Sequence, residues 1–306
     1  MKKILVFNSS VEIFVRPEKE TFVYKMNQLS DTFTSYFARY HDLIIILNGD
    51  KSFIIVGSEK ISITDFDLVY FKQTLGCSEY ASAIAAFLRS RNVSYLCDEV
   101  AESMSLSKVS EYARLDEFQL PIPKTALVHR FSIENYVGII IQELGLPLVM
   151  KDALGRKGQL NFRVSNKQEI IKIANNNPDI DFVFQELIDN GGDYRLLVLG
   201  EKVRFVSYRK RLDDDLTHIN TGTGSIATLI PPEKVPDLCE IALKSAVVMK
   251  RQIAGVDIAI DSKSGRPVIF EVNDAPQIAS GKLVSEKMAA TYEYLNELLN
   301  SEKKAI

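Results

Sequence analysis

Three polar residues stand on two apolar stretches of the sequence that have the pattern of neighbouring strands. Asp257 lies in 254–260, and Glu271 and Asn273 follow a turn-rich tip at 262–267. Because Glu271 and Asn273 are two residues apart, they project from the same face of a strand. Two carboxylates and an amide are hard oxygen ligands that suit Mg²⁺, which takes few protein ligands and completes its shell with phosphates and water. An exposed hairpin with a polar side is the alternative.

A glycine-bearing basic loop, 154–161, follows a predicted buried strand that ends in Lys151. Its glycines allow backbone N–H groups to approach a phosphate, and its Arg-Lys pair adds positive charge. It lacks the GKS or GKT of a Walker-type loop.

Lys108 follows Ser107, a predicted helix cap, and stands in the first turn of the helix, where a cation is disfavoured. Its position indicates a nearby anion such as a phosphate; an ordinary surface lysine is the alternative.

Further charged residues lie on the strands between these features. Asp193 and Arg195 share one face in the first arm of a predicted hairpin, and Arg209 closes the second arm. Lys72 comes just after the C-terminal end of a predicted strand, where open α/β sheets place ligand-binding groups. We therefore treat Lys72 as a candidate substrate contact, with a solvated loop as the alternative.

Length and composition restrict the class of protein. At 306 residues the chain is long enough for about two domains, or for one enzyme with several lobes. Hydrophobic residues make up 46% and charged residues 25%, as in soluble globular proteins. The net charge of −3 argues against a nucleic-acid partner, and no apolar stretch is long enough to span a membrane. The three cysteines are scattered without metal or disulfide spacing, so we expect a cytoplasmic location.

The hydrophobic pattern predicts strands and helices along the whole chain. We expect strands at 4–7, 43–47, 53–56, 68–71, 93–96, 147–151, 162–164, 182–188, 195–199, 202–209 and 254–260, with a further strand through Glu271 and Asn273. We expect helices at 79–91, 107–118, 232–251 and 280–300. Strands and helices alternate in residues 1–105, which predicts a small α/β unit there.

The order of the chemical features resembles that of ATP-grasp enzymes of the RimK type, a branch that includes the peptide-maturing ligases that crosslink ribosomal peptides. The resemblance covers roughly residues 106–300 and includes Gln185-Glu186-Leu187-Ile188 between the basic loop and Asp193. It implies an α/β fold with α+β lobes, that is, an ATP-grasp fold preceded by an N-terminal α/β pre-ATP-grasp domain. The expected domains are 1–105 (pre-ATP-grasp), 106–190 (central lobe) and 191–306 (C-terminal lobe with the metal site).

The resemblance also implies a role for each residue. The expected nucleotide-binding set has two lysines and a loop glycine on the phosphates, 186–188 against adenine, and one carboxylate near the ribose: Lys108, Lys151, Gly158, Gln185, Glu186, Leu187, Ile188 and Asp193. Asp257, Glu271 and Asn273 would bind Mg²⁺, with Mn²⁺ as the alternative ion. Arg195 and Arg209 would be catalytic and face an acyl phosphate. Residues 1–105 would help to bind substrate.

The implied reaction is an ADP-forming ligation. A carboxylate attacks the γ-phosphate of ATP, and an amine or hydroxyl then displaces phosphate from the acyl phosphate. We expect an amino acid, peptide or protein substrate, and homo-oligomer formation stays open. The sequence departs from the RimK pattern at 217–224, where no residue is assigned a role, and at 274–277, where the departure predicts a specialised acceptor side. The alternatives are a phosphotransferase and a non-catalytic ATP-binding or peptide-recognition module.

Overall fold

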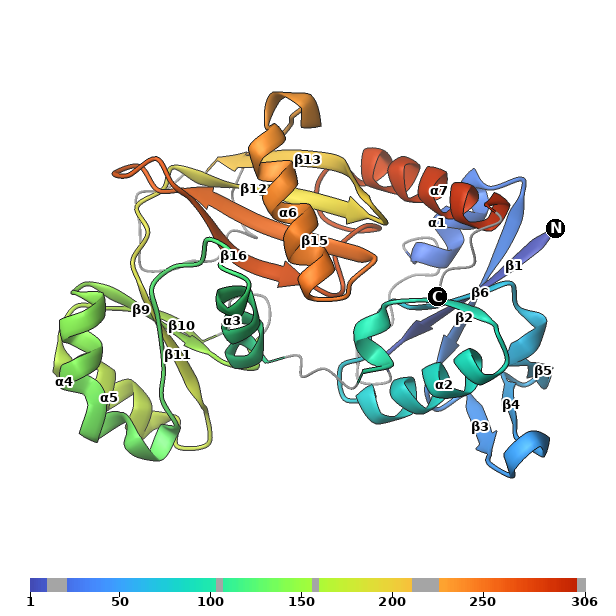
Figure 1. The fold of residues 1–306 in the computed structure, drawn as a ribbon, viewed down its shortest axis with the longest axis horizontal. Helices are drawn as coiled ribbons and strands as arrows, with labels where there is room; N and C mark the ends of the chain where they lie inside the picture. The colour runs from blue at the N-terminus through green and yellow to red at the C-terminus, as the bar shows by residue number, and fades with distance from the viewer. Residues whose placement is uncertain (10–20, 103–106, 156–159, 211–225, 302–306) are drawn as a thin grey trace.

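In the computed structural model, the chain forms an N-terminal unit, a central lobe and a C-terminal lobe (Figure 1). The structure describes residues 1–9, 21–102, 107–155, 160–210 and 226–301. None of the helices in these ranges is long and apolar enough to cross a membrane.

The N-terminal unit is built on a parallel sheet of order β2-β1-β6-β7. Its elements are β1 (Lys2–Asn8), α1 (Phe22–Leu29), β2 (Phe33–Arg39), β6 (Leu68–Phe71), α2 (Ser78–Ser90) and β7 (Ser94–Leu96). Residues 4–7 of β1 are all buried, as expected of a parallel strand covered on both faces. The predicted α/β unit is therefore present, with β2 and α1 added to the predicted elements.

A small antiparallel sheet extends from this unit, at the lower right of Figure 1. It consists of β3 (Leu43–Ile46), β4 (Phe53–Val56) and β5 (Ile61–Ser62), in that order. The two strands predicted at 43–47 and 53–56 exist, but they pair with each other as a hairpin and not with the parallel sheet.

The central lobe has an antiparallel sheet of order β10-β9-β11-β8, with two helices against it (Figure 1). Its elements are β8 (Thr125–Leu127), α4 (Ile133–Leu144), β9 (Leu148–Asp152), β10 (Asn161–Val164), α5 (Lys167–Asn176) and β11 (Phe182–Glu186). The predicted strand 182–188 thus ends two residues early, before the turn-forming residues 189–191.

The C-terminal lobe has a five-stranded antiparallel sheet of order β14-β13-β12-β15-β16. Its elements are β12 (Gly192–Leu199), β13 (Lys202–Lys210), β14 (Ile226–Leu229), α6 (Pro236–Val248), β15 (Ile253–Ile260), β16 (Pro267–Asn273) and α7 (Val284–Asn300). The helix predicted from 232 begins at Pro236, because proline is favoured in the first turn. The helix predicted from 280 begins at Val284, after positive φ angles at Gly281 and Leu283.

Short 3-10 helices mark several connections, namely η2 (Gly49–Lys51), η3 (Ile63–Asp65), η4 (Asp98–Val100), η5 (Arg130–Ser132) and η6 (Pro232–Lys234). The long connection between the N-terminal unit and the central lobe contains α3 (Lys108–Glu117), capped by Ser107, whose side chain accepts a 3.1 Å hydrogen bond from the backbone N–H of Val109. This confirms the predicted cap.

Within the described ranges, three hydrophobic clusters show which parts pack together. The largest joins the N-terminal unit to the C-terminal lobe, including Ile278 and residues of α7 such as Leu295. A second joins α3, through Tyr112 and Leu115, to α6 and the C-terminal sheet. The central lobe has its own cluster, from Ile133 to Phe184. Although α3 lies within the predicted central domain, it packs on the C-terminal lobe. The division into three domains stays a prediction.

Candidate active site

The predicted metal ligands lie on two neighbouring strands of the C-terminal sheet. β15 and β16 are antiparallel, and their register sets Asp257 opposite Glu271 and Gly255 opposite Asn273. The hairpin expected from the sequence is therefore present. Glu271 and Asn273 are half-buried, whereas Val272 between them is buried in the core. The two polar residues thus share the face opposite to Val272, as the period of two predicts.

Asp257 is the centre of a network of alternating charges on β12, β13 and β15. Its Oδ2 accepts a hydrogen bond of 2.7 Å from Nη2 of Arg195 and lies 3.0 Å from Nη2 of Arg209. Arg209 also donates from Nε to Oδ1 of Asp193 over 2.9 Å and contacts the other Asp193 oxygen through Nη2. The three strands are adjacent in the sheet, so residues distant in sequence meet on one surface. Arg195 and Arg209 therefore converge on one carboxylate.

Asp193 is paired with Arg209 on the neighbouring strand, and its expected place near the ribose stays a prediction. It is only 2% exposed, and both of its carboxylate oxygens contact Arg209. Burial and the neighbouring Asp257 carboxylate raise the pKa of Asp193, against the effect of Arg209. A buried carboxylate needs such a cation, because desolvation would otherwise be uncompensated. In this position Asp193 can orient the guanidinium of Arg209.

The residues on β15 and β16 fit a hard divalent cation. Oδ1 of Asp257 is buried and accepts no hydrogen bond from the described residues, although Nε of Arg195 is in ion-pair contact with it. Glu271 adds a carboxylate, and the side-chain oxygen of Asn273, which accepts a hydrogen bond of 2.9 Å from the backbone N–H of Ala275, keeps a second lone pair. No group of three or more His, Cys, Asp and Glu side chains with metal-site geometry occurs in the described ranges. Two carboxylates and an amide match Mg²⁺ that is completed by phosphate oxygens.

Two lysines from different elements converge beside these residues. Lys151, on β9, is buried, and its Nζ lies 5.4 Å from the centre of the Phe270 ring on β16. Burial, together with the charge of Lys108, lowers the pKa of Lys151 to about 8. Lys108 donates through Nζ to the backbone oxygen of Gly155. Two neighbouring cations, one of them desolvated, form a favourable site for a polyanion.

The segment expected to contact adenine lies where the central lobe leads into β12. Gln185 is buried, and its Nε2 donates to Oγ1 of Thr125 over 2.9 Å. Glu186 accepts a 2.8 Å hydrogen bond from the backbone N–H of Lys124 and forms an ion pair with Arg266. These contacts use the amide nitrogen of Gln185 and one carboxylate oxygen of Glu186, whereas Oε1 of Gln185 is buried without a hydrogen-bond partner among the described residues.

Leu187 and Ile188 follow β11 without regular secondary structure, and Ile188 is buried. If this segment contacts a base, the backbone and these apolar side chains are the groups suited to it. Three other expectations lie outside the described residues, namely those for Gly158, for the Arg156-Lys157 pair of the basic loop and for residues 217–224. Lys72 is half-buried just after β6, and its role as a substrate contact stays a prediction.

One buried cluster was missed by the sequence reasoning. Arg251, between α6 and β15, contacts Glu111 of α3 at 3.4 Å and Glu99 of η4 at 3.8 Å. All three side chains are buried. Glu111 could have been noticed from the sequence, because it precedes Tyr112 and Leu115 on the apolar face of a predicted helix, where a charged residue requires a partner.

The chain belongs to the RimK-like ATP-grasp family. The profile of the RimK-like ATP-grasp domain matches residues 97–291. This confirms the family expected from the sequence.

Two curated relatives carry ligase names. A probable alpha-L-glutamate ligase of Desulfotalea psychrophila is 30% identical over 244 residues, which is 76% of this chain and 50% of the relative. A ribosomal protein bS6–L-glutamate ligase of Shigella boydii serotype 4 is 29% identical over 187 residues, which is 59% of each chain. The alignments thus span between half and three-fifths of these two relatives.

Solved structures share the fold. The D-Ala:D-Ser ligase VanG of Enterococcus faecalis superposes with a TM-score of 0.72 at 16% identity, over 97% of this chain and 99% of that one. The ATP-grasp ligase PsnB, in complex with a variant of its minimal precursor, Mg and ADP, gives a TM-score of 0.66 at 14% identity, over 96% and 99%. The expected ATP-grasp fold is confirmed.

Proposed function

We propose that this protein is an ATP-dependent, ADP-forming ligase that activates a carboxylate as an acyl phosphate and joins it to an amine or a hydroxyl. The observation that carries the proposal is the convergence of groups from facing sheets. Lys151 of the central lobe lies against Phe270, next to Glu271 of the C-terminal lobe. Two lysines, two arginines and two carboxylates thus gather where the lobes meet, as transfer of a highly charged phosphoryl group requires.

Each group has a role in the proposed reaction. Lys108 and Lys151 bind the ATP phosphates and neutralise their charge. Asp257, Glu271 and Asn273 would hold Mg²⁺, which would supply positive charge to the phosphates and make the γ-phosphorus more electrophilic; Mn²⁺ is the alternative ion. Arg195 and Arg209 supply positive charge to the phosphate oxygens, and their Nη1 groups are the donors that the described contacts with Asp193 and Asp257 do not use.

The proposed reaction has two steps. A substrate carboxylate oxygen attacks the γ-phosphorus, and the bond to ADP breaks. The amine nitrogen, or the hydroxyl oxygen, then attacks the acyl carbon. Phosphate leaves with the oxygen that the carboxylate contributed, and the nucleophile loses its proton. The arginines stabilise the negative charge that grows on the phosphoryl group and on the departing phosphate.

We propose an amino acid, peptide or protein as the substrate. The names of the two relatives, alpha-L-glutamate ligase and ribosomal protein bS6–L-glutamate ligase, support an amino-acid donor or acceptor. The PsnB complex with a precursor supports a peptide. We also propose that the enzyme acts in the cytoplasm without nucleic acid; formation of a homo-oligomer stays a prediction.

Hydroxylamine trapping tests the proposal. Purified protein, ATP, Mg²⁺ and a panel of amino acids and peptides are incubated with hydroxylamine, and ADP and hydroxamate are quantified. The proposal predicts equal amounts of ADP and hydroxamate with one class of carboxylate. Consumption of ATP with a stable phosphorylated product and no hydroxamate would instead identify a phosphotransferase.

A further inference from the structure

We infer that Arg251 is a positioning residue which, together with Glu111, holds the backbone of Val272 and thereby fixes the spacing of Glu271 and Asn273. The inference rests on the proposed function, because it concerns the metal ligands proposed there. Arg251 contacts neither ligand through its side chain in any described interaction; it acts through the residue between them.

Both backbone polar groups of Val272 are bound by side chains. Its N–H donates to Oε1 of Glu111 over 3.0 Å, and its carbonyl oxygen accepts a hydrogen bond from Nη1 of Arg251. The same Nη1 lies 3.4 Å from Oε2 of Glu111. β16 is an edge strand, so the outward groups of Val272 have no neighbouring strand. Because the site is buried, the two side chains replace the missing strand.

The hydrogen bonds of Val272 affect the position of the two proposed metal ligands beside it. Val272 points its side chain into the core, so Glu271 and Asn273 project from the other face on either side of it. A displacement of Val272 therefore moves both ligands. Metal sites need their ligands within a few tenths of an ångström of the preferred distance, and Mg²⁺ is the stricter case because its octahedral geometry is rigid.

The contact also links β16, which carries two of the proposed metal ligands, to α3, which carries Lys108. Glu111 stands one helical turn after Lys108 in α3. The hydroxyl of Tyr112 donates to the backbone oxygen of Phe270 over 2.6 Å, and the N–H of Ile269 donates to the backbone oxygen of Pro121 over 2.7 Å. The outer edge of β16 is thus bound along its length by α3 and the segment after it. This arrangement sets the distance between the lysine of α3 and the carboxylate of β16.

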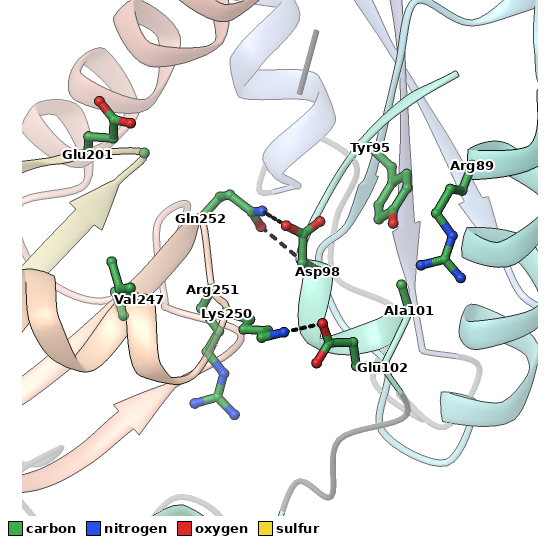
Figure 2. Close-up of a pocket in the computed structure, with 12 residues that line it drawn as sticks. Arg89, Tyr95, Asp98, Ala101, Glu102, Glu201, Val247, Lys250, Arg251 and Gln252 are labelled. Carbon is green, nitrogen blue, oxygen red and sulfur yellow. Dashed lines mark hydrogen bonds and ion pairs between the residues drawn. The ribbon is translucent and has the colours of Figure 1, made fainter. Parts of the chain in front are cut away.

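The N-terminal unit holds the two residues that flank Arg251 in the chain. The Gln252 side chain accepts hydrogen bonds from the backbone N–H groups of Cys97 at 2.8 Å and Asp98 at 3.1 Å, and Lys250 is paired with Glu102. Asp98, Glu102, Lys250 and Gln252 are among the residues that line a pocket of about 450 Å³. Figure 2 shows the guanidinium of Arg251 pointing away from Gln252 and Asp98. The neighbours of Arg251 are therefore anchored, and its side chain is directed toward β16.

A matched control lies in the same cluster. Glu99 is as deeply buried as Arg251 and lies 3.8 Å from its Nε, but no described contact joins Glu99 to β16. Burial raises the pKa of Glu99 to about 8 and that of Glu111 to about 7, against the opposing effect of Arg251. Loss of the Arg251 charge would leave both carboxylates without their cation. Glu99→Gln removes one charge from the cluster without removing a bond to Val272.

The test measures metal binding without relying on turnover. Calorimetry with ADP bound measures the affinity for Mg²⁺ of wild type, Arg251→Lys and Glu99→Gln, and thermal unfolding of the same samples measures stability. Arg251→Lys keeps the charge but loses the planar fork. We expect Arg251→Lys to weaken Mg²⁺ binding about 10- to 100-fold, the range for residues that orient metal ligands. We expect Glu99→Gln to stay within about 3-fold of wild type by the same reasoning, whatever its effect on Tm.

The outcomes separate this inference from the proposed function. If wild type binds Mg²⁺ with ADP and Arg251→Lys binds it equally well, the inference is wrong and the proposed function stands. Equal weakening by Arg251→Lys and Glu99→Gln would show a merely structural role and also overturn the inference. If wild type binds no Mg²⁺ with nucleotide, both fail. Should Arg251→Lys not fold, Glu111→Met replaces it, because it removes the acceptor of the Val272 N–H at similar side-chain size. We expect the same weakening of Mg²⁺ binding, about 10- to 100-fold, and an affinity equal to that of wild type would overturn the inference.

Discussion

Asp193→Asn distinguishes two roles for Asp193, the contact with ribose that the family resemblance implies and the orientation of Arg209 that the structure suggests. In the structure both carboxylate oxygens of Asp193 contact Arg209, and the residue is buried. Asparagine keeps one acceptor and removes the charge, whereas Arg209 keeps Asp257 at 3.0 Å. The loss is thus about one charge-assisted hydrogen bond, worth about 1.5–3 kcal/mol. If that energy orients Arg209 in the transition state, kcat falls roughly 10- to 150-fold.

The assay measures ADP release with ATP and with 2′-deoxy-ATP and 3′-deoxy-ATP. A residue that orients Arg209 affects kcat, leaves KM for ATP nearly unchanged, and leaves the preference for ATP over either deoxy analogue as in wild type. A ribose-binding residue behaves in the opposite way. If Asp193→Asn raises KM for ATP, abolishes discrimination between ATP and a deoxy analogue, and retains kcat, the assignment of Asp193 to Arg209 is refuted.

Three further predictions follow from single sites. Glu271→Gln should abolish turnover while its Tm stays near that of wild type, because Glu271 is half-buried and outside the core; full activity at limiting Mg²⁺ would contradict this. Lys151 has a pKa of about 8, and bound phosphates favour its charged form, so ATP affinity should be greatest below pH 8 and fall as pH rises through 8. Calorimetry at pH 9 in two buffers should then detect proton uptake on ATP binding. Constant ATP affinity from pH 7 to 9.5 would exclude this role of the Lys151 charge. Gly255→Ala should lower the free energy of unfolding in urea by about 1–3 kcal/mol and reduce ADP release. The reason is that a Cβ at this position would lie 3.0 Å from both Nη1 of Arg195 and Cβ of Pro276. Wild-type behaviour in both assays would disprove the clash.

The sequence predicted those parts of the site that depend on local pattern. Alternation and a turn-rich tip were enough to place Asp257 and Glu271 on neighbouring strands, and the register of β15 and β16 sets the two residues opposite each other. The Ser107 cap was equally predictable, since an N-cap depends on the first turn alone. The β12–β13 hairpin about Gly200 follows from the same kind of signal.

Contacts between distant segments were beyond the sequence pattern. Periodicity shows that 43–47 and 53–56 are strands, but it does not name their partners, and β3 and β4 form a sheet of their own. The hydrogen bonds of the Val272 backbone with Arg251 and Glu111 join three segments that are far apart in the chain. The pairing of Asp193 with Arg209 required the register of β12 and β13, which hydrophobic alternation alone does not fix to a single residue.

The most direct test of the central claim follows one oxygen atom. The substrate carboxylate is labelled with ¹⁸O, and the phosphate released during ligation is analysed by mass spectrometry. Our account predicts one ¹⁸O in each phosphate and the amide or ester product in equal amount, because the carboxylate oxygen that attacks the γ-phosphorus leaves with it. Phosphate that carries no ¹⁸O while ATP is consumed and product forms would contradict the acyl-phosphate route.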